Sequence, residues 1–68
     1  MNNYRHVIIR YFINQQKIEF SKTLLMEGMS VTDIAMLLNF NTSSYFSTVF
    51  KKFTALSPMD YLKKQQDS

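Results

Sequence analysis

Residues 30–53 have the sequence SVTDIAMLLNFNTSSYFSTVFKKF, which predicts two short helices joined by a tight turn. Ser30 is a suitable N-cap for the first of them, and Asp33 lies at the third helical position, as in an acidic variant of the capping box. Apolar residues then recur at helical spacing, at Ile34, Leu37 and Leu38. The segment therefore predicts an amphipathic helix that begins just after Ser30.

The second half of this segment predicts a turn and another helix. Asn39 and Asn41 lie on either side of Phe40, and asparagine tolerates the left-handed conformations that sharp turns need. Thr42 is the expected N-cap of the second helix. Its apolar stripe, at steps of three and four, consists of Tyr45, Phe46, Val49, Phe50 and Phe53. The opposite face carries short hydroxyl side chains and two cations, namely Ser43, Ser44, Ser47, Thr48, Lys51 and Lys52.

A helix with this polar face, at the end of a helix-turn unit, fits the major groove of DNA. Its N-terminus after Thr42 offers free backbone N–H groups and the positive end of the helix dipole, which both suit a phosphate. The hydroxyl side chains are short enough for base edges to approach, and they can donate or accept hydrogen bonds. Lys51 and Lys52 lie where flanking phosphates can be reached. The alternative is that these residues only keep an exposed helix face hydrated.

Length and composition limit the other classes of protein. A chain of 68 residues forms at most one small domain, and 46% hydrophobic and 15% aromatic residues predict that it folds. It contains no cysteine, which excludes disulfides and thiolate metal sites and is compatible with a reducing cytoplasm. The net charge of +3 modestly favours a polyanionic partner. No signal peptide and no run long enough to span a bilayer is found, so we expect a cytoplasmic protein without membrane contact.

The segment before the central unit predicts one long helix. Residues 4–27 contain neither proline nor glycine, and Gly28 lies where a helix C-cap is expected. We therefore divide the chain into a linker helix at 1–28 and a helix-turn-helix subdomain at 29–68, which together form one small domain. Ser57 and Pro58 predict the start of a last short helix, with Asp60 in its first turn. No stretch alternates as a strand does, so the predicted fold is all-α.

The long helix carries two apolar stripes on opposite sides at about 100° per residue. One stripe consists of Val7, Tyr11, Ile18, Ser21 and Leu25, and we expect the helix-turn-helix unit to cover it. The other consists of Ile9, Ile13, Phe20 and Leu24. Because a surface helix needs only one apolar face, the second stripe predicts a further contact. We expect a homodimer or docking onto another regulator through these four residues.

From residue 17 to residue 61 the chain resembles the second helix-turn-helix subdomain of AraC/XylS-type bacterial transcriptional regulators. The matching segments are KIEFSKTLL, SVTDIAMLLNF, SSYFSTVFKK and LSPMDYL. The resemblance implies a sequence-specific DNA-binding module that activates or represses transcription, with residues 42–53 as its recognition helix on double-stranded DNA. It places base contacts on Ser43, Ser44, Ser47 and Thr48, with Lys51 at a phosphate. Together with Thr42 and Lys52, these form the candidate DNA-binding set.

Several positions depart from the family pattern. Asn39 and Ala55 stand where glycine is frequent, and Ser21 stands where alanine is usual in the core. Thr48 replaces an arginine of many members, which removes a long, permanently charged donor fork and predicts weak binding. Residues 1–10 cannot supply the first helix-turn-helix that normally precedes the linker helix. We therefore expect a domain reduced to its linker helix and second half.

Two function classes remain open from the sequence. The first is the DNA-binding module, and the second is a protein-interaction module that modulates a full-length regulator through the apolar face of its first helix. An enzyme is not expected, because His6, the only histidine, lies near the chain end, and Asp33 and Asp60 are helix-start acids. We expect no cofactor, metal or small-molecule ligand. Met26, Met29, Met36 and Met59 are expected to fill gaps in the core.

Overall fold

The computed structural model describes the backbone of residues 3–67 and the side chains of residues 4–66, and within them it contains four α-helices and no strand. The helices are α1 (Asn3–Met26), α2 (Val31–Leu37), α3 (Ser43–Thr54) and α4 (Pro58–Asp67). The predicted all-α fold, with a long first helix and three shorter ones, is confirmed. Residues 1–2 and 68, at the outer ends of the two predicted segments, lie outside the described residues.

Each of the three shorter helices begins at a hydroxyl N-cap. The Ser30 Oγ atom accepts a hydrogen bond from the backbone N–H of Asp33 at 3.1 Å. Thr42 Oγ1 accepts one from the N–H of Tyr45 at 3.0 Å, and Ser57 Oγ accepts one from the N–H of Asp60 at 3.1 Å. Because each bond satisfies a backbone donor that has no partner inside the helix, the caps fix where the helices start. The three predicted helix starts are confirmed.

The first three helices end at residues with left-handed backbone. Gly28 has φ +93° beyond the end of α1, Asn39 has φ +63° beyond α2, and Ala55 has φ +69° beyond α3. The first two ends are Schellman motifs, closed by bonds from Met29 N to Leu24 O (3.1 Å) and from Phe40 N to Ala35 O (2.8 Å). The expected left-handed turn at Asn39 is confirmed. Ala55 adopts the same conformation with a Cβ atom, which strains its backbone.

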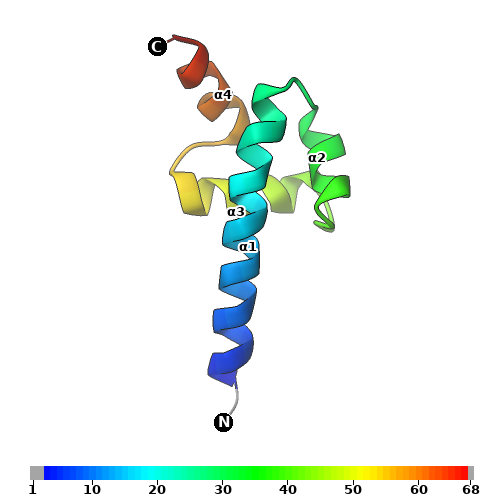
Figure 1. Ribbon diagram of the computed structural model, residues 1–68, viewed down its shortest axis with the longest axis vertical. Helices are drawn as coiled ribbons and strands as arrows, with labels where there is room; N and C mark the ends of the chain where they lie inside the picture. The colour runs from blue at the N-terminus through cyan, green and yellow to red at the C-terminus, as the bar shows by residue number, and fades with distance from the viewer. Residues whose placement is uncertain (1–2, 68) are drawn as a thin grey trace.

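The core lies where the four helices meet (Figure 1). It consists of Ile18, Leu24, Leu25, Ile34, Ala35, Leu38, Phe40, Phe46, Val49 and Phe50. A row of ring contacts crosses it, with centroid separations of 5.2 Å for Phe40–Phe46, 5.8 Å for Phe46–Phe50 and 5.5 Å for Phe50–Tyr61. These are favourable tilted and edge-on geometries. The row ties the turn after α2, the whole of α3 and the start of α4 into one packed unit.

Only the C-terminal half of α1 contributes to this core. The helix is 24 residues long, about 36 Å at 1.5 Å per residue, and its N-terminal half extends beyond the other three helices (Figure 1). Val7 and Tyr11 were expected under the helix-turn-helix unit but are exposed. Leu24, expected on the free stripe, is only 7% exposed and belongs to the core. Its position is covered because α2 and α4 flank the C-terminal end of α1.

Other apolar residues also differ from expectation. Leu37 is exposed on α2, although it shares helical spacing with the buried residues Ile34 and Leu38. The buried arc runs over Ile34, Ala35 and Leu38, and at 100° per residue Leu37 lies outside this arc. Of the methionines expected in the core, only Met29 packs against it, whereas Met26, Met36 and Met59 are exposed. Aliphatic side chains and the aromatic rings fill the interior without them.

We predict that Ala55→Gly stabilises the chain, because glycine adopts φ +69° without the clash of a Cβ atom. The expected gain is about 0.5–1 kcal/mol in the free energy of unfolding, measured by urea denaturation followed by circular dichroism. The same substitution at Ala35, which is buried inside α2, is the control and should cost about 1 kcal/mol or more. A loss of stability in Ala55→Gly would contradict the strain at this position.

Candidate nucleic-acid interface

The helix α3 is held in the middle of the fold by its buried side. Phe46 and Phe50 are fully buried and Val49 is buried beside them, while Phe53 packs against the core at the C-terminal end. The contacts of α3 extend to α1, α2 and α4 alike. Since three neighbours fix its position, the side of α3 that faces away from them is presented on a rigid support.

The opposite side of α3 carries the hydroxyl and lysine side chains predicted there. Ser44, Thr48, Lys51 and Lys52 are exposed, as is the N-cap residue Thr42. Ser43 and Ser47 are half-buried at the edge of this face, so they are less accessible than the sequence predicts. At 100° per residue, Ser43 and Ser47 lie on the flank of α3, beside the row of exposed residues and not within it. None of the seven residues is buried, and all lie on one helix or its cap.

The hydrogen-bonding state of the face leaves several groups for a ligand. Thr48 Oγ1 donates to the carbonyl oxygen of Ser44 at 3.1 Å, so its donor is used while its lone pairs still accept. The hydroxyls of Ser43, Ser44 and Ser47 have no partner among the described residues. These three hydroxyls can therefore donate or accept toward an approaching molecule.

The charges along α3 suit a polyanion. Its sequence contains no acidic residue, and Lys51 and Lys52 lie in the last turn. The lysines stabilise the negative end of the helix dipole, and the opposite end points its positive pole outward beyond Thr42. Among the described residues the one ion pair joins Lys22 to Glu19 on α1, which leaves both lysines of α3 without a carboxylate partner.

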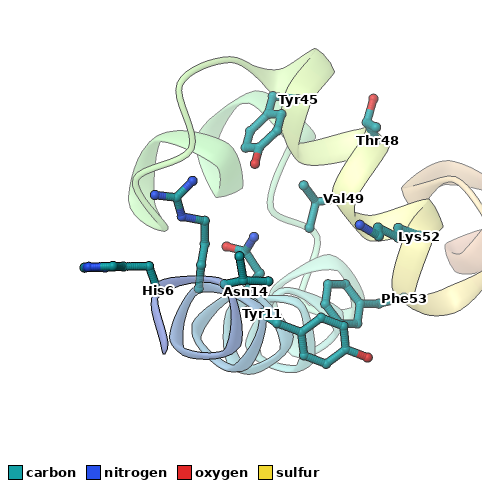
Figure 2. A pocket seen from close by; sticks show the side chains of 10 residues that line it. His6, Tyr11, Asn14, Tyr45, Thr48, Val49, Lys52 and Phe53 are labelled. Carbon is teal, nitrogen blue, oxygen red and sulfur yellow. The ribbon is translucent and has the colours of Figure 1, made fainter. Parts of the chain in front are cut away.

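Tyr45 differs from its predicted place in the hidden apolar stripe. Its side chain is 46% exposed, although the ring lies 5.9 Å from that of Phe40 between centroids. Figure 2 shows its hydroxyl end directed toward α1, across an open space between the two helices. The position is at the edge of the buried arc of α3, which leaves the residue partly exposed.

That open space is a groove between α3 and the N-terminal half of α1, with a volume of about 430 Å³. Its lining comes from two helices: His6, Val7, Arg10, Tyr11 and Asn14 on α1, and Tyr45, Thr48, Val49, Lys52 and Phe53 on α3. The groove was not predicted, because the sequence placed Tyr11 and Val7 beneath the helix-turn-helix unit. The spacing of Arg10 and Asn14 around Tyr11 nevertheless puts these residues on the α3 side of the helix.

Comparison with known proteins identifies the class of this fold. A family model described as "Helix-turn-helix domain" matches residues 2–64. The porin thermoregulatory protein EnvY of Escherichia coli (strain K12) is 44% identical over 43 residues, which are 63% of this chain and 17% of that protein. The HTH-type transcriptional regulator AdiY of the same organism is 27% identical over 59 residues, 87% of this chain and 20% of that protein. No solved structure gives a significant match.

The chain thus spans about a fifth of the length of these curated relatives. No helix among the described residues has the length and apolar character needed to cross a membrane.

We predict that Thr42→Ala weakens the start of α3, because the bond from the Tyr45 N–H to Thr42 Oγ1 is lost. The expected cost is about 1 kcal/mol in the free energy of unfolding, measured by urea denaturation. Ser30→Ala removes the equivalent cap of α2 and serves as the matched control. Amide hydrogen exchange should then rise at Tyr45 in the first variant and at Asp33 in the second. Unchanged stability in both would mean that the caps do not hold these helices.

Proposed function

Because this chain belongs to the AraC-type helix-turn-helix family of bacterial transcriptional regulators, we propose that it binds double-stranded DNA with α3 in the major groove. The observation that carries the proposal is that the one face of α3 left free by packing has hydroxyls and lysines and no carboxylate. The proposed contacts to base edges come from Ser44, Thr48 and the flanking residues Ser43 and Ser47. The bacterial nucleoid is then its place of action.

Phosphate contacts are proposed for the two ends of the same helix. Lys51 and Lys52, in the last turn of α3, are proposed to contact phosphates on one side of the DNA major groove. The backbone N–H groups after Thr42 are proposed to contact phosphates on its other side. One helix-turn-helix unit makes few such contacts, and Thr48 provides no guanidinium for a guanine. We therefore expect an affinity near the range of non-specific binding, about 10⁻⁴–10⁻⁶ M at physiological salt.

We predict that Lys51→Ala weakens binding to all duplexes alike, whereas Ser44→Ala changes the order of preference among them. The measurement is fluorescence anisotropy of labelled duplexes of differing sequence at several salt concentrations. Loss of one phosphate contact should reduce the slope of log K against log salt by about 0.9. Lys63→Ala is the control, since Lys63 is an exposed lysine on α4 that is not part of the candidate DNA-binding set. Equal effects of Lys51→Ala and Lys63→Ala would contradict the assigned interface.

A second candidate function is association through the free side of α1. Ile9, Ile13 and Phe20 are 45–52% exposed on that side, whereas Leu24 is excluded from it by burial. An antiparallel pair of α1 helices centred on Gln16 would place Arg5 of one copy opposite Glu27 of the other. The pairing would bury apolar side chains of both copies between two Arg5–Glu27 contacts, one at each end, and we propose a second copy of this helix as the occupant. A longer regulator that carries the same helix could be bound in the same way.

We predict that the unaltered chain sediments as a dimer at high concentration, and that the double variant Ile13→Gln, Phe20→Gln sediments as a monomer with the same helix content. The two residues lie outside the core, so the variant should fold. Ile8→Gln, Phe12→Gln is the control pair on a neighbouring exposed side of α1. A monomeric unaltered chain, at every concentration measured, would exclude this second function and leave DNA binding untouched.

A further inference from the structure

We propose that the groove between the N-terminal half of α1 and α3 binds an amphipathic helix whose apolar side is flanked by carboxylates. Figure 2 shows the two helices as the walls of the groove, and all ten of its lining residues belong to them. A third helix packed into such a groove contacts both walls, as in other helix-in-groove complexes. The occupant is identified by its chemistry, an acidic amphipathic segment of another protein.

The floor of the groove is apolar. Val7 and Tyr11 line it from α1, and Val49 and Phe53 line it from α3. The rings of Tyr11 and Phe53 meet at 5.0 Å between centroids, which links the two walls at one end (Figure 2). The volume of about 430 Å³ has space for a few apolar side chains, such as those at positions i, i+3 and i+4 of a helix.

The edges of the groove are positively charged. Arg10 lies on the α1 wall and Lys52 on the α3 wall, with the imidazole of His6 at the outer end. No aspartate or glutamate is among the lining residues, and neither Arg10 nor Lys52 forms an ion pair with any described residue. Cations on both walls of an apolar floor are complementary to a helix with acids on both sides of an apolar stripe.

Hydrogen-bonding groups in the groove are also without partners. The amide of Asn14, half-buried on α1, and the hydroxyl of Tyr45 make no hydrogen bond to a described residue. They lie on opposite walls of the groove, Asn14 on α1 and Tyr45 on α3, and Figure 2 shows the Tyr45 hydroxyl end directed toward α1. Carboxylates accept hydrogen bonds from amide and hydroxyl donors, so the same acids can satisfy them.

A second copy of this chain does not fit the groove. Residues 4–18 of α1 contain Arg5, Arg10 and Lys17 but no acid, and α3 has none either. Either helix from another copy would bring like charges to Arg10 and Lys52, which is unfavourable. The occupant must therefore supply carboxylates of its own.

Occupation of the groove has a consequence for DNA, which rests on the proposed function. Thr48 and Lys52 line the groove and also belong to the candidate DNA-binding set. An acidic helix that holds Lys52 withdraws this cation from a phosphate and adds negative charge beside α3. Peptide and duplex are then expected to compete, so that such a partner would act as an inhibitor of DNA binding.

The test is a titration of the full 68-residue chain into a fluorescein-labelled designed peptide, followed by anisotropy. The peptide is an amphipathic helix with leucines on one side and glutamates flanking them. A second peptide has glutamine at each glutamate position. We expect the glutamate peptide to bind at least about tenfold more tightly than the glutamine peptide, with the difference reduced at high salt. Equal affinity of the two peptides, or no binding of either, would overturn the proposal.

Two matched pairs of variants locate the site. Val7 and Ile8 are 64% and 65% exposed, but only Val7 lines the groove, so Val7→Asp should weaken binding of the glutamate peptide about tenfold and Ile8→Asp should not. Likewise Arg10→Glu should weaken it and Arg5→Glu, outside the groove, should not. Equal effects within either pair would place the peptide elsewhere on α1 and overturn the assignment.

A competition experiment separates this proposal from DNA binding. Unlabelled glutamate peptide should displace a labelled duplex from the chain. The uncharged variant Val7→Gln should require more peptide for the same displacement while its duplex affinity stays the same, because it adds no charge beside α3. If the chain binds no duplex, the peptide titration still stands or fails by itself. If both ligands bind together without mutual effect, the inhibitory consequence is wrong.

Discussion

The structure depends on the burial of two phenylalanines one turn apart on α3. Phe46 and Phe50 are fully buried, and they contact the ring of Phe40 in the preceding turn and the ring of Tyr61 on α4. Their burial also requires the C-terminal half of α1, where Ile18 and Leu25 are buried in the same cluster. With this side fixed, rotation of α3 about its axis would bring rings into water, at a cost of several kcal/mol. The polar face of α3 is therefore fixed on the side that faces solvent.

Local chemistry explains why much of the fold follows from the sequence. Helix boundaries are set by the caps at Ser30, Thr42 and Ser57 and by the glycine at 28. Because these residues act on backbone only a few positions away, the boundaries can be predicted from the local sequence. The buried side of α3 follows from the spacing of its aromatic residues. Since the aromatic side of α3 is buried, the exposure of Ser44, Thr48 and the two lysines on its opposite side can be predicted as well. Positions at the edge of the buried arc, such as Tyr45 and Ser47, are not fixed by periodicity alone.

Long-range placement could not be predicted in the same way. Helical periodicity gives the direction of a side chain around α1 but not the point along the axis at which its neighbours end. Ile18 and Tyr11 share a stripe, yet Ile18 is fully buried in the core beside Phe46 and Phe50, whereas Tyr11 lies about two turns nearer the N-terminus and is exposed. Leu24 is buried for the complementary reason, because the neighbours spread more widely around the C-terminal end. The groove beside α3 arises at the boundary between the two halves.

The departures from the family pattern have structural consequences that remain local. Ser21 is fully buried, and its hydroxyl is satisfied by donating to the Ile18 carbonyl at 2.6 Å, so a polar atom in the core leaves no unpaired group. Asn39 holds the left-handed turn that positions Phe40 over the core, and asparagine is the side chain that does so at least cost after glycine. Ala55 holds the equivalent turn at the other end of α3 with more strain.

The two left-handed turns precede and follow α3, and they determine which residues of the proposed interface lie on this helix. The turn at Asn39 sets where Thr42 begins the helix, and the turn at Ala55 sets where Lys51 and Lys52 end it. The candidate DNA-binding set and the α3 wall of the groove lie between these turns and share Thr48 and Lys52. A ligand on one face therefore meets the charge of Lys52 as a ligand on the other does. Because α3 is held rigidly on its buried side, this sharing acts through electrostatics and excluded space and requires no conformational change.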